Sequence, residues 1–335
     1  MRIAFTTELP REGFKRLVER GILEIGDWRL KIEDLSPNEL RETNVLISTF
    51  DYKVSREVIN SMPNLQLIAN FGAGYNNIDL DACRERGIRV TNTPKSVIEP
   101  TAELAFALMI DVARRVSEFD RMLRSHVNGA NGENGDTSFN GVFGVMRNLS
   151  HSLYGKTLGI IGMGRIGQAL ARRAAASGMK IIYHNRHEIN GDALKALNGG
   201  NDEMVKYVDF QTLLQDSDFV SLNLPYTPEV HHLIGKPELG MMKRTAFLIN
   251  TARGAHVHEE ALIEALKNGI IAGAAMDVYE FEPSISTELL SLPNVVLSPH
   301  TGTGTWEGRI AMCEEVTDNI LAFVENRPKD MNIVN

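Results

Sequence analysis

Short apolar runs alternate with helical patterns through the first hundred residues. Strand-like runs lie at 3–5, 45–47, 67–69 and 88–91, and residues 12–20 and 79–86 carry apolar positions at helical spacing. Alternation of this kind is typical of a parallel, doubly wound sheet. The sequence therefore predicts an α/β fold for this part of the chain.

Good helix formers dominate residues 99–123, and Pro100 stands near their beginning. This pattern predicts one long helix, suited to crossing between two domains. The composition then changes abruptly, because residues 128–136 consist largely of Gly and Asn. Both residue types disfavour helix and strand interiors, so we expect a loop or a mobile arm here.

The second half repeats the alternation of strands and helices. Strands are expected at 156–161, 180–183, 219–222, 246–249, 271–275 and 295–297, with a helix at 259–268 that Gly269 ends. A last helix, at about 307–325, follows all of these strands, and we expect it to pack back on the first domain. The first domain would then be discontinuous, formed by residues 1–100 and 302–335, with residues 101–301 as the second domain.

Bulk composition narrows the class of protein. The chain has 335 residues, long enough for two domains, and a formal net charge of −8 without a run of like charges. This balance argues against nucleic acid and anionic membranes as partners. Cys83 and Cys313 show no paired metal-ligand spacing, and no targeting or membrane-spanning segment is evident. We expect a cytoplasmic protein without a metal.

A glycine turn joins the strand at 156–161 to a helical run that continues through Gln168. It reads Gly162-Met163-Gly164-Arg165-Ile166-Gly167. Glycines let the backbone approach a pyrophosphate, and the unpaired N–H groups at the start of a helix face its negative charge. The GxGxxG pattern alone is weak, but the strand before it and the helix after it favour a dinucleotide site. The alternative is a tight turn without a ligand.

The end of the next strand bears on the choice of cofactor. A carboxylate about 20 residues after the turn would hold the ribose hydroxyls of NAD, whereas an Arg there accommodates the extra phosphate of NADP. The strand ends in His184-Asn185-Arg186-His187, with no carboxylate before Glu188. NADP(H) is therefore favoured, or at least tolerated. The alternative is that Arg186 is a solvated residue at a strand end.

Three later strand ends carry groups suited to ketone reduction. Arg253 follows the strand at 246–249, Glu280 and Glu282 follow the strand at 271–275, and His300 follows the strand at 295–297. An Arg can grip a carboxylate, a His can donate a proton, and an acid can keep that His protonated. Individually, each has a plain alternative as a turn residue or a solvated acid. Together, on one expected crevice beside the glycine turn, they favour catalysis.

These motifs resemble the D-isomer-specific 2-hydroxyacid dehydrogenase family over nearly the whole chain. Residues 71–79 resemble its substrate-binding glycine loop, and Thr101-Ala102-Glu103 resembles the start of its cofactor-side helix. The resemblance implies two doubly wound parallel-sheet domains, a Rossmann dinucleotide-binding domain and a flavodoxin-like substrate domain, with the active site in the cleft. It also implies a homodimer formed through the nucleotide domain.

By the same resemblance, Ala73 and Gly74 would hold the substrate carboxylate, Arg253 would bind the 2-oxo acid, and His300 would be the acid/base. Glu282 rather than Glu280 would be the partner of His300, because it directly precedes Pro283. Asp277 would contact the nicotinamide side of the cofactor. The full cofactor set implied is Thr101, Gly162, Gly164, Arg165, Ile166, Gly167, Asn185, Arg186, Pro225, Thr251, Ala252, Asp277 and Gly302.

The chain departs from the family pattern in places. Asn185 stands where many members carry the Asp that selects NAD, and His258 stands where an acid is usual. Residues 128–136 resemble an insertion in a neighbourhood that contributes to dimer arms. The chain is also short for the regulatory domain of long phosphoglycerate dehydrogenases, so we expect none.

We expect reduction of a short 2-oxo acid by NAD(P)H to the D-2-hydroxy acid, with glyoxylate, hydroxypyruvate, pyruvate and branched 2-oxo acids all open. Phe50, Tyr52 and Trp306 either line an apolar pocket for the substrate side chain or are core and surface aromatics. Two other classes remain as alternatives. One is a nicotinamide-sensing binding protein like the related corepressors, and the other is a formate or phosphite dehydrogenase on the same scaffold.

Overall fold

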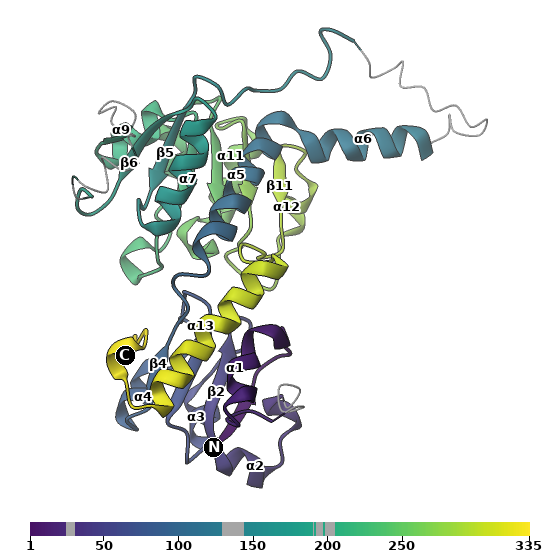
Figure 1. Cartoon of the computed structure of the whole chain (residues 1–335). Coiled ribbons are helices and arrows are strands. Elements are labelled where there is room, and N and C mark those ends of the chain that lie inside the picture. Colours follow the sequence, from purple (N-terminus) through teal and green to yellow (C-terminus); the bar gives the residue numbers. More distant parts are fainter. Residues whose placement is uncertain (25–30, 129–143, 190, 192–196, 198–204) are drawn as a thin grey trace. The chain divides into compact units, whose positions relative to one another are not determined.

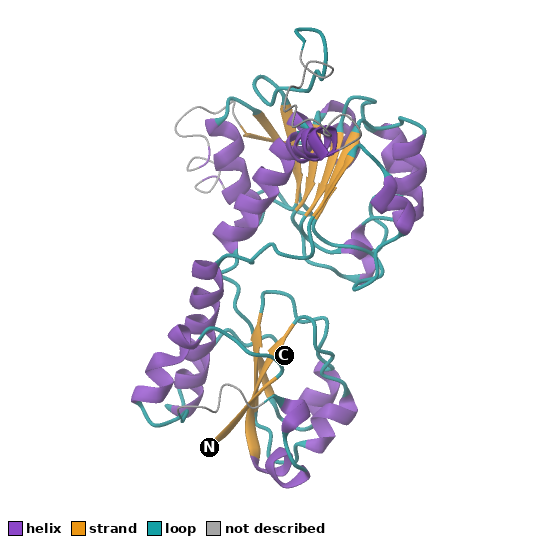
Figure 2. Cartoon of the chain, turned by 90° about the vertical axis from the view of Figure 1, so that its right-hand side faces the viewer, coloured by secondary structure: helices purple, strands orange, loops and turns teal. Residues whose placement is uncertain are grey.

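The chain folds into two compact units. The structure is a computed structural model that describes residues 1–24, 31–128, 144–189, 191, 197 and 205–335. Unit 1 comprises Met1–Pro100 and Thr303–Asn335, and unit 2 comprises Thr101–Gly302. In each unit, helices cover both faces of a parallel sheet (Figure 2). Within the described residues, none of the helices has the length and apolar character needed to cross a membrane.

Unit 1 is built on four parallel strands in the order β1-β2-β3-β4. An isolated parallel bridge joins Phe5 to Lys31 on the other edge of β1, so a fifth segment extends the sheet there. In chain order the sheet therefore runs 2-1-3-4-5, which is the flavodoxin-like arrangement. The strands are β1 (Arg2–Phe5), β2 (Thr43–Thr49), β3 (Leu67–Phe71) and β4 (Arg89–Thr91).

The last helix of the chain belongs to unit 1 (Figure 1). It is α13 (Trp306–Val324), and it contacts β3 and the 3-10 helix η1 (Arg11–Phe14). The approach to η1 is close, because a Cβ added at Gly13 would lie 2.2 Å from Cys313 Cβ. The other helical segments among the described residues of unit 1 are α1 (Lys15–Glu19), η3 (Ile32–Asp34), α2 (Pro37–Glu42), α3 (Arg56–Ser61), α4 (Leu80–Glu85) and η7 (Pro328–Asp330).

Unit 2 contains a seven-stranded parallel sheet in the order β11-β10-β9-β8-β5-β6-β7. In chain order this is a Rossmann sheet, whose strand order reverses between β5 and β8, and ligands bind at that point in such sheets. The two parallel-sheet domains expected from the sequence are confirmed. The strands are β5 (Thr157–Ile161), β6 (Lys180–His184), β7 (Val205–Tyr207), β8 (Phe219–Leu222), β9 (Phe247–Asn250), β10 (Gly273–Met276) and β11 (Val295–Leu297).

Helical segments, most of them short, connect the strands of unit 2. The helix predicted at 259–268 is confirmed as α11 (Glu259–Lys267), and Gly269 follows it with φ +62°. The other connecting segments that the structure describes between β5 and β11 are α7 (Arg165–Ala176), α9 (Phe210–Asp216), η5 (Pro228–Val230), α10 (Lys236–Met241), η6 (Gly254–His256) and α12 (Thr287–Ser291).

The single helix predicted over 99–123 is wrong. The structure has two helices, α5 (Ile98–Arg114) and α6 (Val116–Asn128), separated by Arg115 with φ +57°. Asp111 accepts a hydrogen bond from Ser117 N–H at 2.8 Å and another from the Ser117 hydroxyl. This side chain thus satisfies the start of α6, which a periodicity pattern does not reveal.

Helix α6 extends away from the sheet of unit 2 (Figure 1). Of the Gly/Asn stretch at 128–136, only Asn128 is described, as the last residue of α6, and residues 129–143 lie outside the described part. Exposed apolar side chains occur on α6 and on the segment before β5. They are Val116, Leu123, Val145, Met146, Leu149 and Tyr154.

Candidate active site

The glycine turn joins β5 to α7 at the point where the order of the sheet reverses. Gly162 has φ +96°, and a Cβ there would lie 2.6 Å from the Asn223 carbonyl oxygen. A Cβ at Gly167 would lie 2.4 Å from the Gly162 carbonyl oxygen. Packing therefore requires both glycines. At Gly164, by contrast, nothing lies within 4 Å of an added Cβ.

The space beside Gly164 suits a pyrophosphate. Gly164 precedes α7 and gives no side-chain hydrogen bond to the helix, and the first turn of α7 carries no acid. The start of this 12-residue helix thus offers backbone N–H groups and a positive dipole end. No packing contact of the described residues requires a glycine at position 164, so the backbone there is open to close approach of a ligand.

Asn185 and Arg186 follow β6 beside this turn. Asn185 Oδ1 accepts a hydrogen bond from Met163 N–H at 2.7 Å, so the amide that replaces an acid also braces the turn. Arg186 is exposed. Hydrogen bonds of the Glu229 carboxylate to Thr227 and to its own backbone lower the pKa of Glu229 most, and the charge of Arg186 lowers it further. The preceding His184 is held elsewhere, because its Nδ1–H donates to the Val208 carbonyl at 3.0 Å.

Three buried polar atoms lie at the carboxyl ends of neighbouring strands. They are Asn223 Oδ1 after β8, Thr251 Oγ1 after β9 and Asp277 Oδ2 after β10, and none has a hydrogen-bond partner among the described residues. A buried polar atom without a partner costs free energy, so such a row is suited to a polar ligand. The donor and acceptor groups of a nicotinamide nucleotide fit this need.

Asp277 is the most buried of the three, with a relative exposure of 1%. Its Oδ1 accepts hydrogen bonds from the Ser298 hydroxyl at 2.6 Å and from Thr301 N–H at 2.8 Å. Its Oδ2 faces Gly302, where an added Cβ would lie 3.3 Å from it and 3.5 Å from Thr101. The structure therefore brings Thr101, Asp277 and Gly302 together, whereas Pro225 lies exposed in the loop after β8.

Glu282 and His300 form a hydrogen-bonded pair. His300 Nδ1–H donates to Glu282 Oε2 at 2.8 Å, and the His300 and Glu282 side chains are 24% and 33% exposed. Tyr279 N–H holds the other carboxylate oxygen at 2.9 Å. Burial opposes ionisation of Glu282, but the hydrogen bond and charge of His300, the Tyr279 N–H and the charge of Arg253 together lower its pKa. Glu282 is thus a carboxylate, oriented on the imidazole.

Glu280, the other acid of this loop, lies in a different environment. Its Oε1 accepts a hydrogen bond from His232 at 2.6 Å and its Oε2 one from Glu259 N–H at 2.9 Å. The two acids therefore face two different histidines. Of these two acids, Glu282 is the one that pairs with His300.

Arg253 follows β9, Thr251 and Ala252, and it directly precedes the 3-10 helix η6. Burial lowers the pKa of its guanidinium, while the charge of Glu282 acts in the opposite direction. Its Nη1 donates to the Ala252 carbonyl at 2.6 Å, which leaves further donors of the fork for a ligand. Arg253, Glu282 and His300 therefore lie within one electrostatic group in unit 2.

The glycine loop of unit 1 is fixed through its carbonyl groups. Asn70 Nδ2 donates to the carbonyls of Gly72 and Gly74 at 3.1 and 2.8 Å, and Asn92 Nδ2 donates to that of Ala73 at 2.8 Å. The N–H groups of Ala73 and Gly74 donate no hydrogen bond within the described part of the chain. Their carbonyl groups are held by the two Asn side chains, and their N–H groups have no acceptor among the described residues, an arrangement suited to an anion.

Arg309 is a candidate that the sequence reasoning missed. It lies in the first turns of α13, and its guanidinium carbon is 5.6 Å from the centre of the Phe71 ring, at the start of the glycine loop. Burial lowers the pKa of the Arg309 guanidinium, and the negative charge of Asp51 acts in the opposite direction. The signal in the sequence was an Arg nine residues after His300 at the start of a helix.

The predicted aromatic pocket stays a prediction. Tyr52 packs partly against the core of unit 1, and Trp306 is 65% exposed. Phe50 is also exposed, at the end of β2.

The fold and the site define the class of protein. A Rossmann sheet, a glycine turn with open space beside Gly164 and a histidine–carboxylate pair are typical of a nicotinamide-dependent oxidoreductase. Comparison with known proteins identifies the family. Residues 106–302 match the NAD binding domain of D-isomer specific 2-hydroxyacid dehydrogenases. A glyoxylate reductase from Thermococcus litoralis is 42% identical over 326 residues, which cover 97% of this chain and 94% of that protein.

Solved structures agree over the full fold. The TT0316 protein from Thermus thermophilus superposes with a TM-score of 0.84 at 38% identity, covering 100% of both chains. An NADPH-dependent glyoxylate/hydroxypyruvate reductase from Sinorhizobium meliloti, in complex with NADP and malonate, gives a TM-score of 0.78 at 31% identity, covering 96% of this chain and 93% of the other. The protein belongs to the D-isomer specific 2-hydroxyacid dehydrogenase family. It is an NAD(P)-dependent oxidoreductase of 2-oxo and 2-hydroxy acids.

Proposed function

We propose that this enzyme reduces glyoxylate or hydroxypyruvate to the D-2-hydroxy acid with His300 as the proton donor. The observation that carries the proposal is the 2.8 Å hydrogen bond between His300 and the ionised Glu282, in the same electrostatic group as Arg253. Relatives named glyoxylate reductase and glyoxylate/hydroxypyruvate reductase support the choice of substrate.

The roles of the residues in unit 2 follow from their chemistry. The Arg253 guanidinium binds the oxygen atoms of the 2-oxo acid, because its fork matches paired acceptors. His300 gives its Nε2 proton to the carbonyl oxygen as the alcohol forms. Glu282 is a positioning residue: it accepts the Nδ1–H and stabilises the imidazolium before transfer.

Unit 2 also holds the cofactor in this proposal. The turn from Gly162 to Gly167 and the start of α7 bind the pyrophosphate, and Asp277, Thr251 and Asn223 bind the nicotinamide nucleoside through their unpartnered atoms. When bound, the reduced nicotinamide supplies a hydride to the substrate carbonyl carbon.

Unit 1 serves as the substrate domain. The free amides of Ala73 and Gly74 bind the substrate carboxylate. Arg309, half-buried beside Phe71, adds positive potential to that loop.

We further propose a preference for NADP(H). Asn185 carries no charge that would repel a ribose phosphate, and the exposed Arg186 supplies a positive one. An Arg186→Ser variant should bind NADPH about 10-fold or more weakly, since a hydrogen bond to a charged group contributes about 1.5–3 kcal/mol. NADH affinity should stay the same. No loss for NADPH would show that Arg186 is a solvated strand-end residue, and equal loss for both cofactors would show that it does not select the ribose phosphate.

Homodimerisation and a cytoplasmic location complete the proposal. The exposed apolar side chains on α6 and on residues 145–149 suit contact with a second copy of this chain. Analytical ultracentrifugation would measure the mass, and a Leu123→Glu variant should be a monomer if this surface forms the dimer. Both cysteines are free and buried, which suits a reducing compartment.

A substrate panel tests the central proposal. Glyoxylate, hydroxypyruvate, pyruvate and a branched 2-oxo acid would be assayed with NADPH and with NADH, following the loss of nicotinamide absorbance. We expect the two small substrates to give the highest kcat/KM, and Arg253→Ala to raise KM and lower kcat. Oxidation of formate or phosphite instead would contradict the proposal, and so would inactivity with retained cofactor binding, which favours a sensor.

A further inference from the structure

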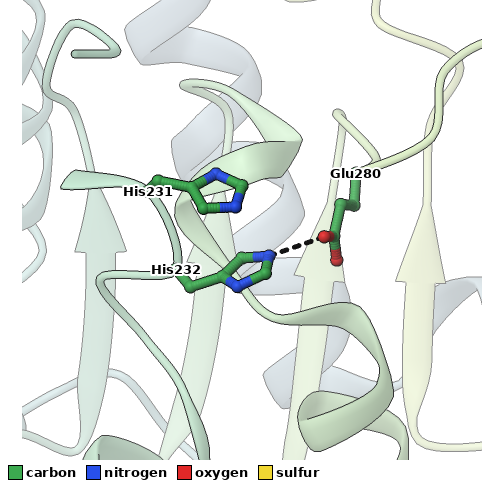
Figure 3. Close-up of side chains that lie close together, drawn as sticks. All are labelled: His231, His232 and Glu280. Carbon is green, nitrogen blue, oxygen red and sulfur yellow. Dashed lines mark hydrogen bonds and ion pairs between the residues drawn. The ribbon is translucent and has the colours of Figure 1, made fainter. Parts of the chain in front are cut away.

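A second histidine cluster lies in unit 2, apart from the His300–Glu282 pair. His231 and His232 follow η5, and Glu280 lies in the loop between β10 and α12 (Figure 3). One ligand atom from each of the three residues lies within 4.8 Å of the others. The two imidazole rings stack with their centres 3.8 Å apart, and both lie toward the Glu280 carboxylate.

Groups around the cluster orient these three side chains. Glu280 Oε2 accepts from Glu259 N–H at 2.9 Å, so its other oxygen is turned to His232. The Tyr226 hydroxyl lies 3.3 Å from His231 Nδ1, which leaves Nε2 as the atom to bind a ligand. Outer contacts of this kind orient the ligands in metal sites.

The backbone also sets the position of the histidines. His232 adopts φ +52°, and its N–H donates to the Ala255 carbonyl at 2.8 Å. A non-glycine residue in this conformation is held there by its surroundings, and such strain accumulates at functional positions. His231 itself is exposed, so an ion can reach the cluster from solvent.

We propose that His231, His232 and Glu280 bind one divalent transition-metal ion, of which Zn²⁺ is the representative. Two imidazoles and a carboxylate are a ligand set that zinc accepts, with water in the fourth position. Mg²⁺ and Ca²⁺ prefer oxygen ligands and should not bind. This assignment differs from the metal-free protein expected from sequence.

Binding would replace one hydrogen bond by coordination. His232 Nε2–H donates to Glu280 Oε1 at 2.6 Å. The ion takes the place of this proton, and the ring keeps one proton on Nδ1: a neutral imidazole moves its proton there, and an imidazolium releases one proton to solvent. Ligand atoms around a tetrahedral zinc are about 3–3.5 Å apart, so the cluster has to contract by about 1–2 Å. The exposed ring of His231 can make this movement.

The consequence is a cross-link within unit 2. The ion would join the loop after β8 to the loop that carries Glu280 and, two residues later, Glu282. Binding to the folded state alone stabilises that state by mass action. We therefore expect Zn²⁺ to raise the Tm of the protein.

Zinc titration of the untagged full-length protein, after treatment with a chelator, tests the site. A chromogenic chelator reports the free ion, and calorimetry reports the Tm with and without Zn²⁺. We expect one Zn²⁺ per chain. Loss of an outer contact alone weakens metal binding about 10–100-fold, so His231→Gln, which removes a ligand, should weaken it more than about 100-fold.

His187→Gln is the matched control, because His187 is an exposed histidine of the same unit outside the cluster. The thiols should not compete, since burial raises the pKa of Cys83 to about 11 and that of Cys313 to about 12. His231→Gln should keep the reductase activity measured in chelator, which shows that it folds. Equal zinc affinity of wild type and His231→Gln, or absence of stoichiometric binding to wild type, would overturn the proposal.

Discussion

Two glycines of the β5–α7 turn should respond oppositely to the same small change. Gly162→Ala adds a methyl group 2.6 Å from the Asn223 carbonyl oxygen and 2.9 Å from Leu224 N, in a backbone with φ +96°. Gly164→Ala adds a methyl group with nothing within 4 Å. The fold should therefore resist the first change and tolerate the second.

The magnitude for Gly162→Ala has two parts. A left-handed backbone costs about 1–2 kcal/mol for a residue with a Cβ, and overpacking against backbone costs about 1–3 kcal/mol. The free energy of unfolding should thus fall by about 2–5 kcal/mol. For a unit of about 200 residues, each kcal/mol lowers Tm by about 2–4 °C, so the expected fall is about 4–20 °C.

For Gly164→Ala, the loss of a favourable N-cap residue costs less than about 1 kcal/mol of stability. Cofactor binding should suffer instead, because the methyl group occupies the space where a pyrophosphate approaches the backbone. Loss of one charge-assisted hydrogen bond, about 1.5–3 kcal/mol, corresponds to about 10–150-fold weaker binding.

Scanning calorimetry gives the Tm of both variants, and quenching or enhancement of NADPH fluorescence gives the Kd of Gly164→Ala. Two results would refute the reasoning. If Gly164→Ala binds NADPH as tightly as wild type, the pyrophosphate does not approach this turn. If Gly162→Ala keeps the Tm of wild type, the close approach of β5 to the Asn223 loop does not constrain the fold.

Two further predictions concern the histidine–carboxylate pair. His300→Ala should lower kcat by about 10²–10⁴-fold and leave NADPH affinity unchanged, as stopped-flow turnover and fluorescence titration would show; near-normal turnover would contradict the acid/base role. Because folding lowers the pKa of Glu282, its ionised form adds stability above the unfolded value of about 4.3 and loses that contribution as the pH falls through the folded value. The stability advantage of wild type over Glu282→Gln, about 0.5–1 kcal/mol for this partly exposed pair, should thus be present near neutral pH and shrink in acid; calorimetry at several pH values measures it, and a growing advantage would contradict the reasoning.

Much of the architecture was predictable because it depends on local sequence. Apolar runs of three to six residues between helical patterns indicated the strands, and a glycine after α11 indicated the end of that helix. Short or polar elements were not predicted. Strand β7 (Val205–Tyr207) has only one buried residue, and α2 and α3 are each six residues long, so neither presents a long apolar stripe.

The break at Arg115 shows the limit of periodicity. Residues on both sides are good helix formers, but the Asp111 side chain binds Ser117 and begins a second helix. Such a side-chain hydrogen bond competes with the backbone hydrogen bonds that would continue the first helix. The tertiary structure decides which of the two forms.

By itself, the sequence determined the class of fold, the position of the glycine turn and the residue types at the strand ends. These follow from periodicity and from the special conformations of glycine, which act over a few residues. The tertiary structure decided which partners those residues meet. Glu282 faces His300 and Glu280 faces His232, although the two acids are two residues apart, because loops from distant parts of the chain surround each of them. The tertiary structure also decided which glycines of the turn are needed for packing. Gly162 and Gly167 have no room for a Cβ, whereas Gly164 has open space beside it.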